Sequence, residues 1–191
     1  MLCSYSCNEN KKENFINNKN IEVIPSSNDL FYEFDREKFS LVQEGILLNL
    51  DGKYLGAIEK FNEAELVYGE MIQIYLNRGM AYSSIDNLTR AEIDFTKCIK
   101  LDSLFLPPYL NRGLIYTHSG RAEKGILDFS AAIRIRPSEP ASYLNRAVAY
   151  RKSNKIDLAC SDLKKAKSLG ISEKYNSDMT DKMINELNCK K

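Results

Sequence analysis

Residues 75–79 read YLNRG, residues 109–113 read YLNRG again, and residues 143–147 read YLNRA. The phrase therefore returns every 34 residues. A fixed period of this length is typical of a protein whose helical units stack into a solenoid. Such arrays usually present long binding surfaces, whereas an enzyme needs polar groups that converge in a pocket. The period favours a binding protein over a catalyst.

The same register places four units along the chain, at 38–71, 72–105, 106–139 and 140–173. Within each unit the apolar residues follow helical spacing, which predicts two amphipathic helices. Small and large residues recur at fixed positions. The eighth position of the unit holds Gly45, Gly79, Gly113 and Ala147, and the twenty-fourth holds Phe61, Phe95, Phe129 and Leu163. Small residues at the eighth position would allow the paired helices to approach closely.

The predicted turns between paired helices contain residue types that tolerate the left-handed backbone conformation. These residues are Gly52, Asp86, Gly120 and Asn154. Pro107, Pro108 and Pro140 fall at the start of a first helix, where a missing amide donor costs little. The turn chemistry therefore agrees with the period.

These recurring positions resemble the tetratricopeptide repeat, a helix-turn-helix family with Trp or Tyr, Leu, Gly, Tyr, Ala, Phe, Ala and Pro at characteristic places. The resemblance is specific in the second to fourth units. It is weaker in the first, where Leu41 replaces the aromatic residue and Gly69 stands where Pro is common. It implies an all-α fold, a right-handed α-α solenoid of four repeats followed by a C-terminal capping helix.

The seventh position departs from the Leu that is usual in the family. It holds Arg78, Arg112 and Arg146, and the twenty-third position holds Asp94, Asp128 and Asp162. In the first unit the charges are reversed, as Glu44 and Lys60. We predict that each pair closes within its own unit, because pairing across units would set Lys60 against Arg78. Ion pairs of this kind are structural rather than functional.

The segments outside the units have their own predicted roles. Residues 1–30 are rich in Asn and Lys and read as a flexible leader. Residues 31–37 are a possible N-terminal cap. Residues 174–191 are predicted to form a capping helix and a tail, with an apolar stripe of Met179, Met183, Ile184 and Leu187. A solenoid needs such a cap for solubility.

In this family the first helices of the units line a concave groove, so the resemblance implies a peptide-binding site there. The fifth and ninth positions would make the groove apolar, with Leu76, Met80, Leu110, Leu114, Leu144 and Val148. The sixth position adds an amide ladder of Asn77, Asn111 and Asn145. Each amide has a donor and an acceptor, so it can bind a peptide backbone of any sequence. The alternative is that these amides hydrogen-bond within the array.

Other function classes lack their residues. Chaperone-binding members clamp a carboxylate with Lys, Asn and Arg, but the matching positions here include Val42, Ile46 and Pro107, so we expect no affinity for acidic chaperone tails. The net charge of +1 gives no electrostatic footprint for nucleic acid. We predict a non-catalytic adaptor without cofactors that binds an extended or helical segment of another protein. Its alternative is a scaffold subunit whose array is mainly structural.

Cysteine usage bears on the compartment. The chain has five cysteines without a CxxC pair, and one histidine, His118. The residues needed for a zinc site or for Cys/His catalysis are therefore not present in the usual spacing. Cys98 and Cys160 are predicted to be buried and free. Residues 4–7, SYSC, resemble the end of a bacterial lipoprotein signal, which would make Cys7 a lipidation site of an envelope protein. If Met1 is the genuine start, a cytoplasmic protein is expected instead.

Overall fold

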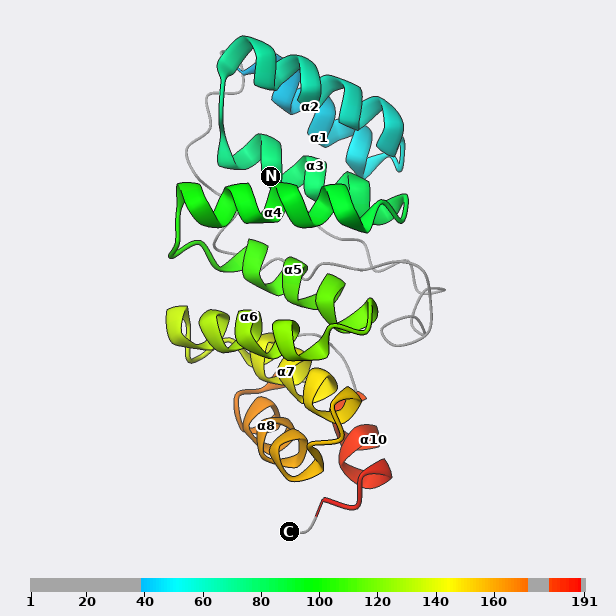
Figure 1. Cartoon of the computed structure of the whole chain (residues 1–191), viewed down its shortest axis with the longest axis vertical. Coiled ribbons are helices and arrows are strands. Elements are labelled where there is room, and N and C mark those ends of the chain that lie inside the picture. Colours follow the sequence, from blue (N-terminus) through cyan, green and yellow to red (C-terminus); the bar gives the residue numbers. More distant parts are fainter. Residues whose placement is uncertain (1–38, 172–178, 190–191) are drawn as a thin grey trace.

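The computed structural model describes residues 39–171 and 179–189. Within these ranges the chain forms α-helices and no strand. Eight helices pair into four hairpins: α1 (Ser40–Leu50) with α2 (Tyr54–Tyr68), α3 (Ile72–Ser84) with α4 (Leu88–Leu101), α5 (Leu106–His118) with α6 (Ala122–Ile135), and α7 (Pro140–Lys152) with α8 (Ile156–Ser168). The helix α10 (Met179–Glu186) follows. The hairpins stack along the long axis of the molecule, which confirms the predicted all-α solenoid (Figure 1).

The four hairpin turns share one backbone geometry. The predicted turn residues all have positive φ, with 74° at Gly52, 62° at Asp86, 77° at Gly120 and 57° at Asn154. The next residue in each turn donates its N–H to the carbonyl five positions earlier, at 2.8 Å in all four units. This is the hydrogen bond that closes a helix ending in a left-handed residue. Turn chemistry read from the sequence therefore sets where each first helix stops.

The paired helices leave no room for a side chain where a glycine faces a phenylalanine. A Cβ atom added at Gly113 would lie 2.7 Å from a ring carbon of Phe129, and one at Gly79 would lie 2.8 Å from Phe95. Both rings are fully buried. The fourth unit replaces this pair with Ala147 and Leu163, so a larger residue on one helix accompanies a smaller one on the other.

The predicted ion pairs form within their units. Each arginine holds its aspartate with two bonds, from Nε and Nη2, at 2.7–2.9 Å. In the first unit, Lys60 Nζ lies 3.3 Å from Glu44 Oε2. The reversed pair therefore closes in the same place as the others, as expected.

The arginines also reach back to the preceding hairpin, which the sequence analysis did not foresee. Nη1 of Arg112 donates to Thr96 Oγ1 at 2.9 Å, and Nη1 of Arg146 donates to Ser130 Oγ at 3.0 Å. The same atom of Arg78 donates to Asn62 Oδ1 at 2.8 Å. The acceptors share the twenty-fifth position of the unit, and their polar character was the available signal. Each guanidinium thus joins two hairpins.

Glu65 is the centre of a hydrogen-bond network between the first two hairpins. Its donors are Arg78 at 2.6 Å, Tyr75 at 2.8 Å and Lys97 at 3.0 Å. Partial burial raises the pKa of Glu65, but the hydrogen bonds from these donors outweigh it and lower the pKa from 4.5 to about 2. The folded state therefore stabilises the ionised carboxylate of Glu65 over its protonated form.

This shift predicts an acid-sensitive contribution to stability. A carboxyl group with a lowered folded pKa stabilises the fold above its unfolded pKa and loses that effect as the pH falls towards the folded value. We expect Glu65 to contribute about 2–3 kcal/mol at pH 7, lost between about pH 5 and 2. Urea unfolding across this range should show a smaller acid-induced loss for Glu65→Gln than for the wild type. The control Glu59→Gln changes an exposed glutamate on α2. If Glu65→Gln lost stability between about pH 5 and 2 as steeply as the wild type does, Glu65 would not be the source of the acid sensitivity.

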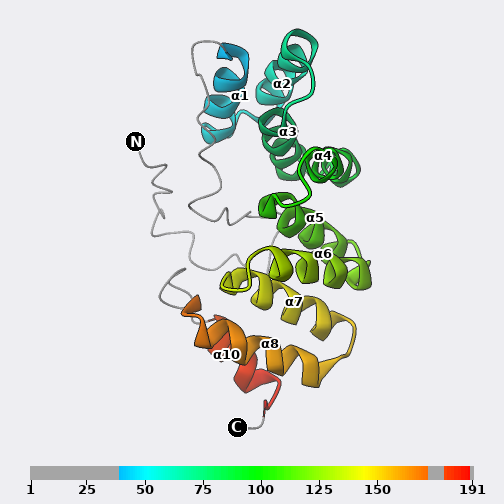
Figure 2. The same ribbon diagram turned by 90° about the vertical axis from the view of Figure 1, so that its left-hand side faces the viewer.

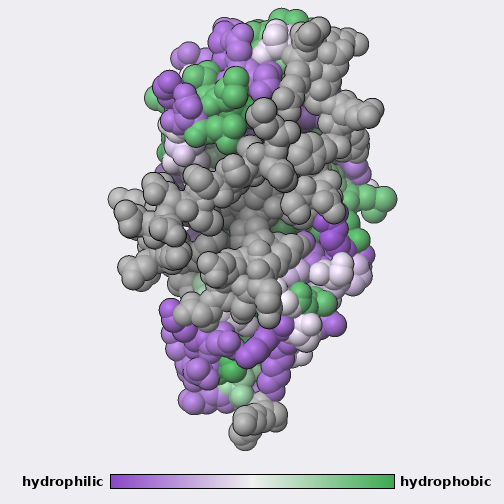
Figure 3. Space-filling model, turned by 180° about the vertical axis from the view of Figure 1, so that it is seen from behind, coloured by the Kyte–Doolittle hydropathy of each residue, from purple (hydrophilic) through white to green (hydrophobic). Residues whose placement is uncertain are grey.

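The stack is curved, and its two ends lean towards the same side, where α1 and α10 lie (Figure 2). At the end formed by the first hairpin, a patch of hydrophobic side chains lies among hydrophilic ones (Figure 3). Leu47 is 53% exposed, although its equivalents Ala81, Ile115 and Ala149 are fully buried. Each of these equivalents has a hairpin before it, and Leu47 has none among the described residues. The possible cap at 31–37 lies outside those residues.

The opposite end of the stack is covered by α10. Met183 is fully buried in a cluster with Leu163, Ala166 and Ile171, and the other apolar residues of the stripe lie partly buried around it. The stripe seen in the sequence thus packs against the last hairpin. Among the described helices, none is long and apolar enough to cross a membrane.

Candidate peptide-binding face

The first helices of neighbouring hairpins lie beside one another, so equivalent residues of α3, α5 and α7 fall on one side of the stack. In Figure 2, α1 and α3 lie towards the inner side of the bend, with α2 and α4 outside them. We call the surface formed by the fifth, sixth and ninth positions of these helices the inner face. It contains Leu76, Asn77, Met80, Leu110, Asn111, Leu114, Leu144, Asn145 and Val148.

The two apolar positions of the inner face differ in accessibility. At the fifth position, Leu76, Leu110 and Leu144 are buried. They serve mainly to pack the helices together. At the ninth position, Met80, Leu114 and Val148 are only partly buried and keep apolar surface available. The ninth position is therefore the better candidate for contact with a ligand.

The three amides are in different states. Asn77 Nδ2 donates to the carbonyl of Gln73 on its own helix at 2.8 Å, which is the bonding within the array that the sequence left open. Asn111 is 0% exposed, and neither Nδ2 nor Oδ1 has a hydrogen-bond partner. Asn145 is partly buried. Leaving a buried amide unpaired costs free energy that a suitable partner would recover.

Side chains outside the predicted set connect the first helices. Asn49 Nδ2 donates to the Asn77 carbonyl at 2.9 Å, and Lys152 Nζ donates to the Thr117 carbonyl at 3.1 Å. Both donors lie near the ends of their helices, at the twelfth and thirteenth positions of their units. Sequence reasoning missed these bonds, because the repeated pattern does not include them.

Charge is distributed unevenly along this side of the molecule. The second, fifth, sixth, ninth, twelfth and thirteenth positions of α3, α5 and α7 carry no carboxylate. The basic residues at these positions, Arg151 and Lys152, lie at the end of α7. Arg151 Nη1 is 3.5 Å from Glu186 Oε2 of α10. The inner face itself is therefore uncharged, and two basic residues adjoin it at the end of α7.

A model of the tetratricopeptide repeat matches residues 72–103, 106–139 and 140–169. The chain belongs to the tetratricopeptide repeat family. These matches fall on the second, third and fourth units, where the sequence pattern was strongest. Tetratricopeptide repeat proteins are typically non-catalytic scaffolds for protein–protein interaction. Among curated proteins, no match was found.

Solved structures of tetratricopeptide repeat proteins have a similar fold. The protein in a crystal structure of MamA protein has 24% sequence identity to this chain, and the two structures superpose with a TM-score of 0.66. The match covers 71% of this chain and 74% of that chain. MamA 41-end from Desulfovibrio magneticus RS-1 is 15% identical, with a TM-score of 0.70, over 83% of this chain and 89% of that chain. A thermophilic tetratricopeptide repeat protein of Thermus thermophilus is 17% identical, with a TM-score of 0.62, over 78% of this chain and 79% of that chain. At these identities the likeness shows the fold alone.

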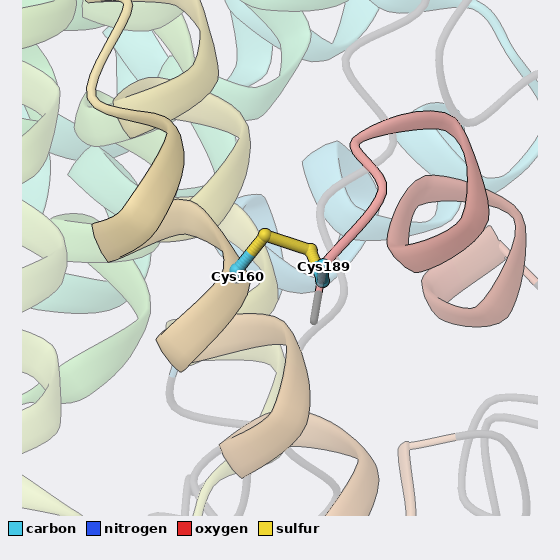
Figure 4. The surroundings of a disulfide bond; sticks show 2 residues. All are labelled: Cys160 and Cys189. Carbon is cyan, nitrogen blue, oxygen red and sulfur yellow. A yellow bond between two sulfur atoms is a disulfide. The ribbon is translucent and has the colours of Figure 1, made fainter. Parts of the chain in front are cut away.

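The prediction of a free Cys160 is wrong for this tetratricopeptide repeat protein. Cys160 of α8 forms a disulfide with Cys189, which follows α10 (Figure 4). The two residues are 29 positions apart in the sequence, and their Cα atoms are 5.4 Å apart. The sequence could not reveal the pairing, because it arises only when α10 packs against α8. Cys98 is free and buried, as predicted.

Cys98 is the free cysteine in the part of the repeat array that the structure describes. Burial raises the pKa of the Cys98 thiol, which keeps it protonated and unreactive. No group of three or more potential metal ligands occurs among residues 39–171 and 179–189. A shallow hollow beside Met71, Ile72 and Leu101 lies at the start of α3 and the end of α4. The possible lipidation site, Cys7, lies outside the described residues.

Proposed function

We propose that the inner face binds an extended segment of another protein. The main chain of the segment would bond to the amides of the sixth position, and its apolar side chains would contact the ninth position. The observation that carries the proposal is Asn111, whose buried amide has neither its donor nor its acceptor satisfied. Because Asn111 is 0% exposed, its side chain would have to turn outwards to meet a passing backbone, whose C=O and N–H are the two groups that this amide lacks.

Magnitudes show that the amides cannot provide the affinity alone. A net hydrogen bond is worth about 0.5–1.5 kcal/mol, so an amide that makes two contributes about 1–3 kcal/mol. Asn77 already bonds to Gln73, so Asn111 and Asn145 together would supply about 2–6 kcal/mol, less than the roughly 8 kcal/mol that micromolar binding needs. The partly buried Met80, Leu114 and Val148 would have to supply most of the difference through apolar contact. We therefore propose a segment rich in apolar side chains, with the amides fixing the path of its backbone.

A displayed library of random peptides, selected on the full chain, tests this proposal. We expect selected peptides to lose about 5- to 100-fold in affinity with Asn111→Ala, measured by calorimetry, because two hydrogen bonds are removed. Asn77→Ala should have a smaller effect, because the Asn77 amide already bonds to Gln73. This comparison uses the same chemical change at the same position of two units.

Leu127→Ala provides the control for the outer surface, because Leu127 is 69% exposed on α6. Binding should be unchanged in this variant. Peptides that bind equally well to the wild type and to Asn111→Ala, or that lose affinity with Leu127→Ala, would place the binding surface elsewhere. A library that yields no binder at all would favour the alternative function, in which the array is a structural scaffold.

A further inference from the structure

The helix α10 packs on the last hairpin through its apolar stripe, and its ion pairs with the hairpins are at least partly exposed. The helix has eight residues, a length that is marginal without tertiary support. Within α10, the large side chain of Met183 is fully buried. The Thr180 hydroxyl is also buried and has no hydrogen-bond partner. The ion pair between Lys167 and Asp181 is about half exposed on both sides, so it contributes little. The covalent bond between Cys160 and Cys189 is therefore the strongest link between α10 and the hairpins.

The two cysteines of the disulfide differ in exposure. Cys160 is nearly buried in α8, whereas Cys189 is partly exposed beyond the end of α10. Figure 4 shows the bond between the α8 ribbon and the stretch that follows α10. An external thiolate can approach the Cys189 sulfur more readily than the Cys160 sulfur, and such access is what permits thiol–disulfide exchange.

Docking of α10 also changes the charge at the inner face. It places Glu186 against Arg151, one of the two basic side chains at the α7 end of that face. When α10 is held, a carboxylate of the same chain partly neutralises Arg151. When α10 is released, the guanidinium is free to pair with a carboxylate of another molecule.

We propose that the Cys160–Cys189 disulfide is a redox clamp on α10, and that its reduction frees Arg151 to bind an acidic residue of the segment held on the inner face. The binding step rests on the proposed function, whereas the clamp does not. To form the bond, the two thiols lose two protons and give two electrons to an oxidising disulfide such as glutathione disulfide. That oxidant leaves as two thiols, and a reducing thiol reverses the reaction.

The clamp is tested on the full chain without any ligand. Peptide mapping by mass spectrometry first establishes the disulfide, because the chain also contains Cys3, Cys7 and Cys98. Hydrogen exchange of α10 and modification of Arg151 by phenylglyoxal are then compared in oxidised protein, in protein reduced with dithiothreitol, and in Cys189→Ser. We expect reduction or substitution to remove the exchange protection of α10. The rate of Arg151 modification should rise about two- to fivefold, as the loss of a surface ion pair implies.

Two controls accompany this experiment. Arg134 on α6 is exposed and distant from α10 in the sequence, so its modification rate should not respond to reduction. Cys98→Ala removes the buried free cysteine and should leave the redox response intact. If α10 stays equally protected in Cys189→Ser, or if Arg151 reacts at the same rate in both redox states, the clamp does not exist.

The link to binding uses a peptide recovered from the library that ends in Asp, and a matched peptide that ends in Asn. The Asp peptide should bind about two- to fivefold more tightly to reduced than to oxidised protein, and this gain should vanish in Arg151→Gln. A redox response of α10 without any peptide binding would refute the proposed function but not the clamp. Peptide binding that ignores the redox state would leave the proposed function standing and refute the link.

Discussion

Asp128→Lys is expected to lower the free energy of unfolding by about 3–5 kcal/mol, because it leaves a largely buried guanidinium without its partner. Arg112 and Asp128 are only 16% and 9% exposed at their side chains. The substitution removes two bonds of 2.8 Å and places two positive charges together. Urea unfolding followed by circular dichroism measures the loss.

Adding Arg112→Glu to the same chain should restore part of this stability. The first unit already uses the reversed arrangement, with Glu44 and Lys60 at 3.3 Å. Recovery should be incomplete, because Lys cannot form the forked pair and Thr96 loses the donor that Arg112 supplies. The double variant without any recovery would refute the pairing as a stabilising contact. In a control, Asp51→Lys alters an exposed pair and should change stability by less than about 1 kcal/mol.

Gly113→Ala is expected to destabilise the fold by about 1–3 kcal/mol, although alanine is the better helix former. Its new methyl group would lie 2.7 Å from the Phe129 ring, which is fully buried. The melting temperature, followed by circular dichroism, should fall by several degrees.

The matched control for this substitution is Gly56→Ala. A Cβ at Gly56, in the first turn of α2, would meet only the Leu48 side chain, at 3.6 Å, an ordinary contact distance. This variant should therefore be neutral or more stable by about 0.5–1 kcal/mol. A loss at Gly56 equal to that at Gly113 would show that helix packing is not the cause.

A double variant tests the mechanism further. Gly113→Ala with Phe129→Leu copies the arrangement that the fourth unit has naturally in Ala147 and Leu163. The combined loss should be smaller than the sum of the two single losses, because the smaller leucine leaves room for the new methyl group. Additive losses would mean that the new methyl group at position 113 is not in steric contact with the side chain at position 129.

The candidate site was only partly predictable. The sequence placed Asn77, Asn111 and Asn145 at one position of three successive units, which the stacked helices bring to the same side. It could not show that Asn77 bonds to its own helix while Asn111 is buried without a partner. Residues with the same repeat position have different neighbours, and the neighbours decide how each amide is satisfied.

The repeated pattern was sufficient for the features that lie inside one unit. The helix pairs, the left-handed turn residues and the contacts of Arg112 with Asp128 all join residues at short, constant separations, so four copies of the same spacing expose them. The contacts between units and at the end of the stack depend on three-dimensional packing. The network around Glu65 and the bond between Cys160 and Cys189 belong to this group. Only the stacking of complete hairpins brings these side chains within bonding distance, and no period in the chain records it.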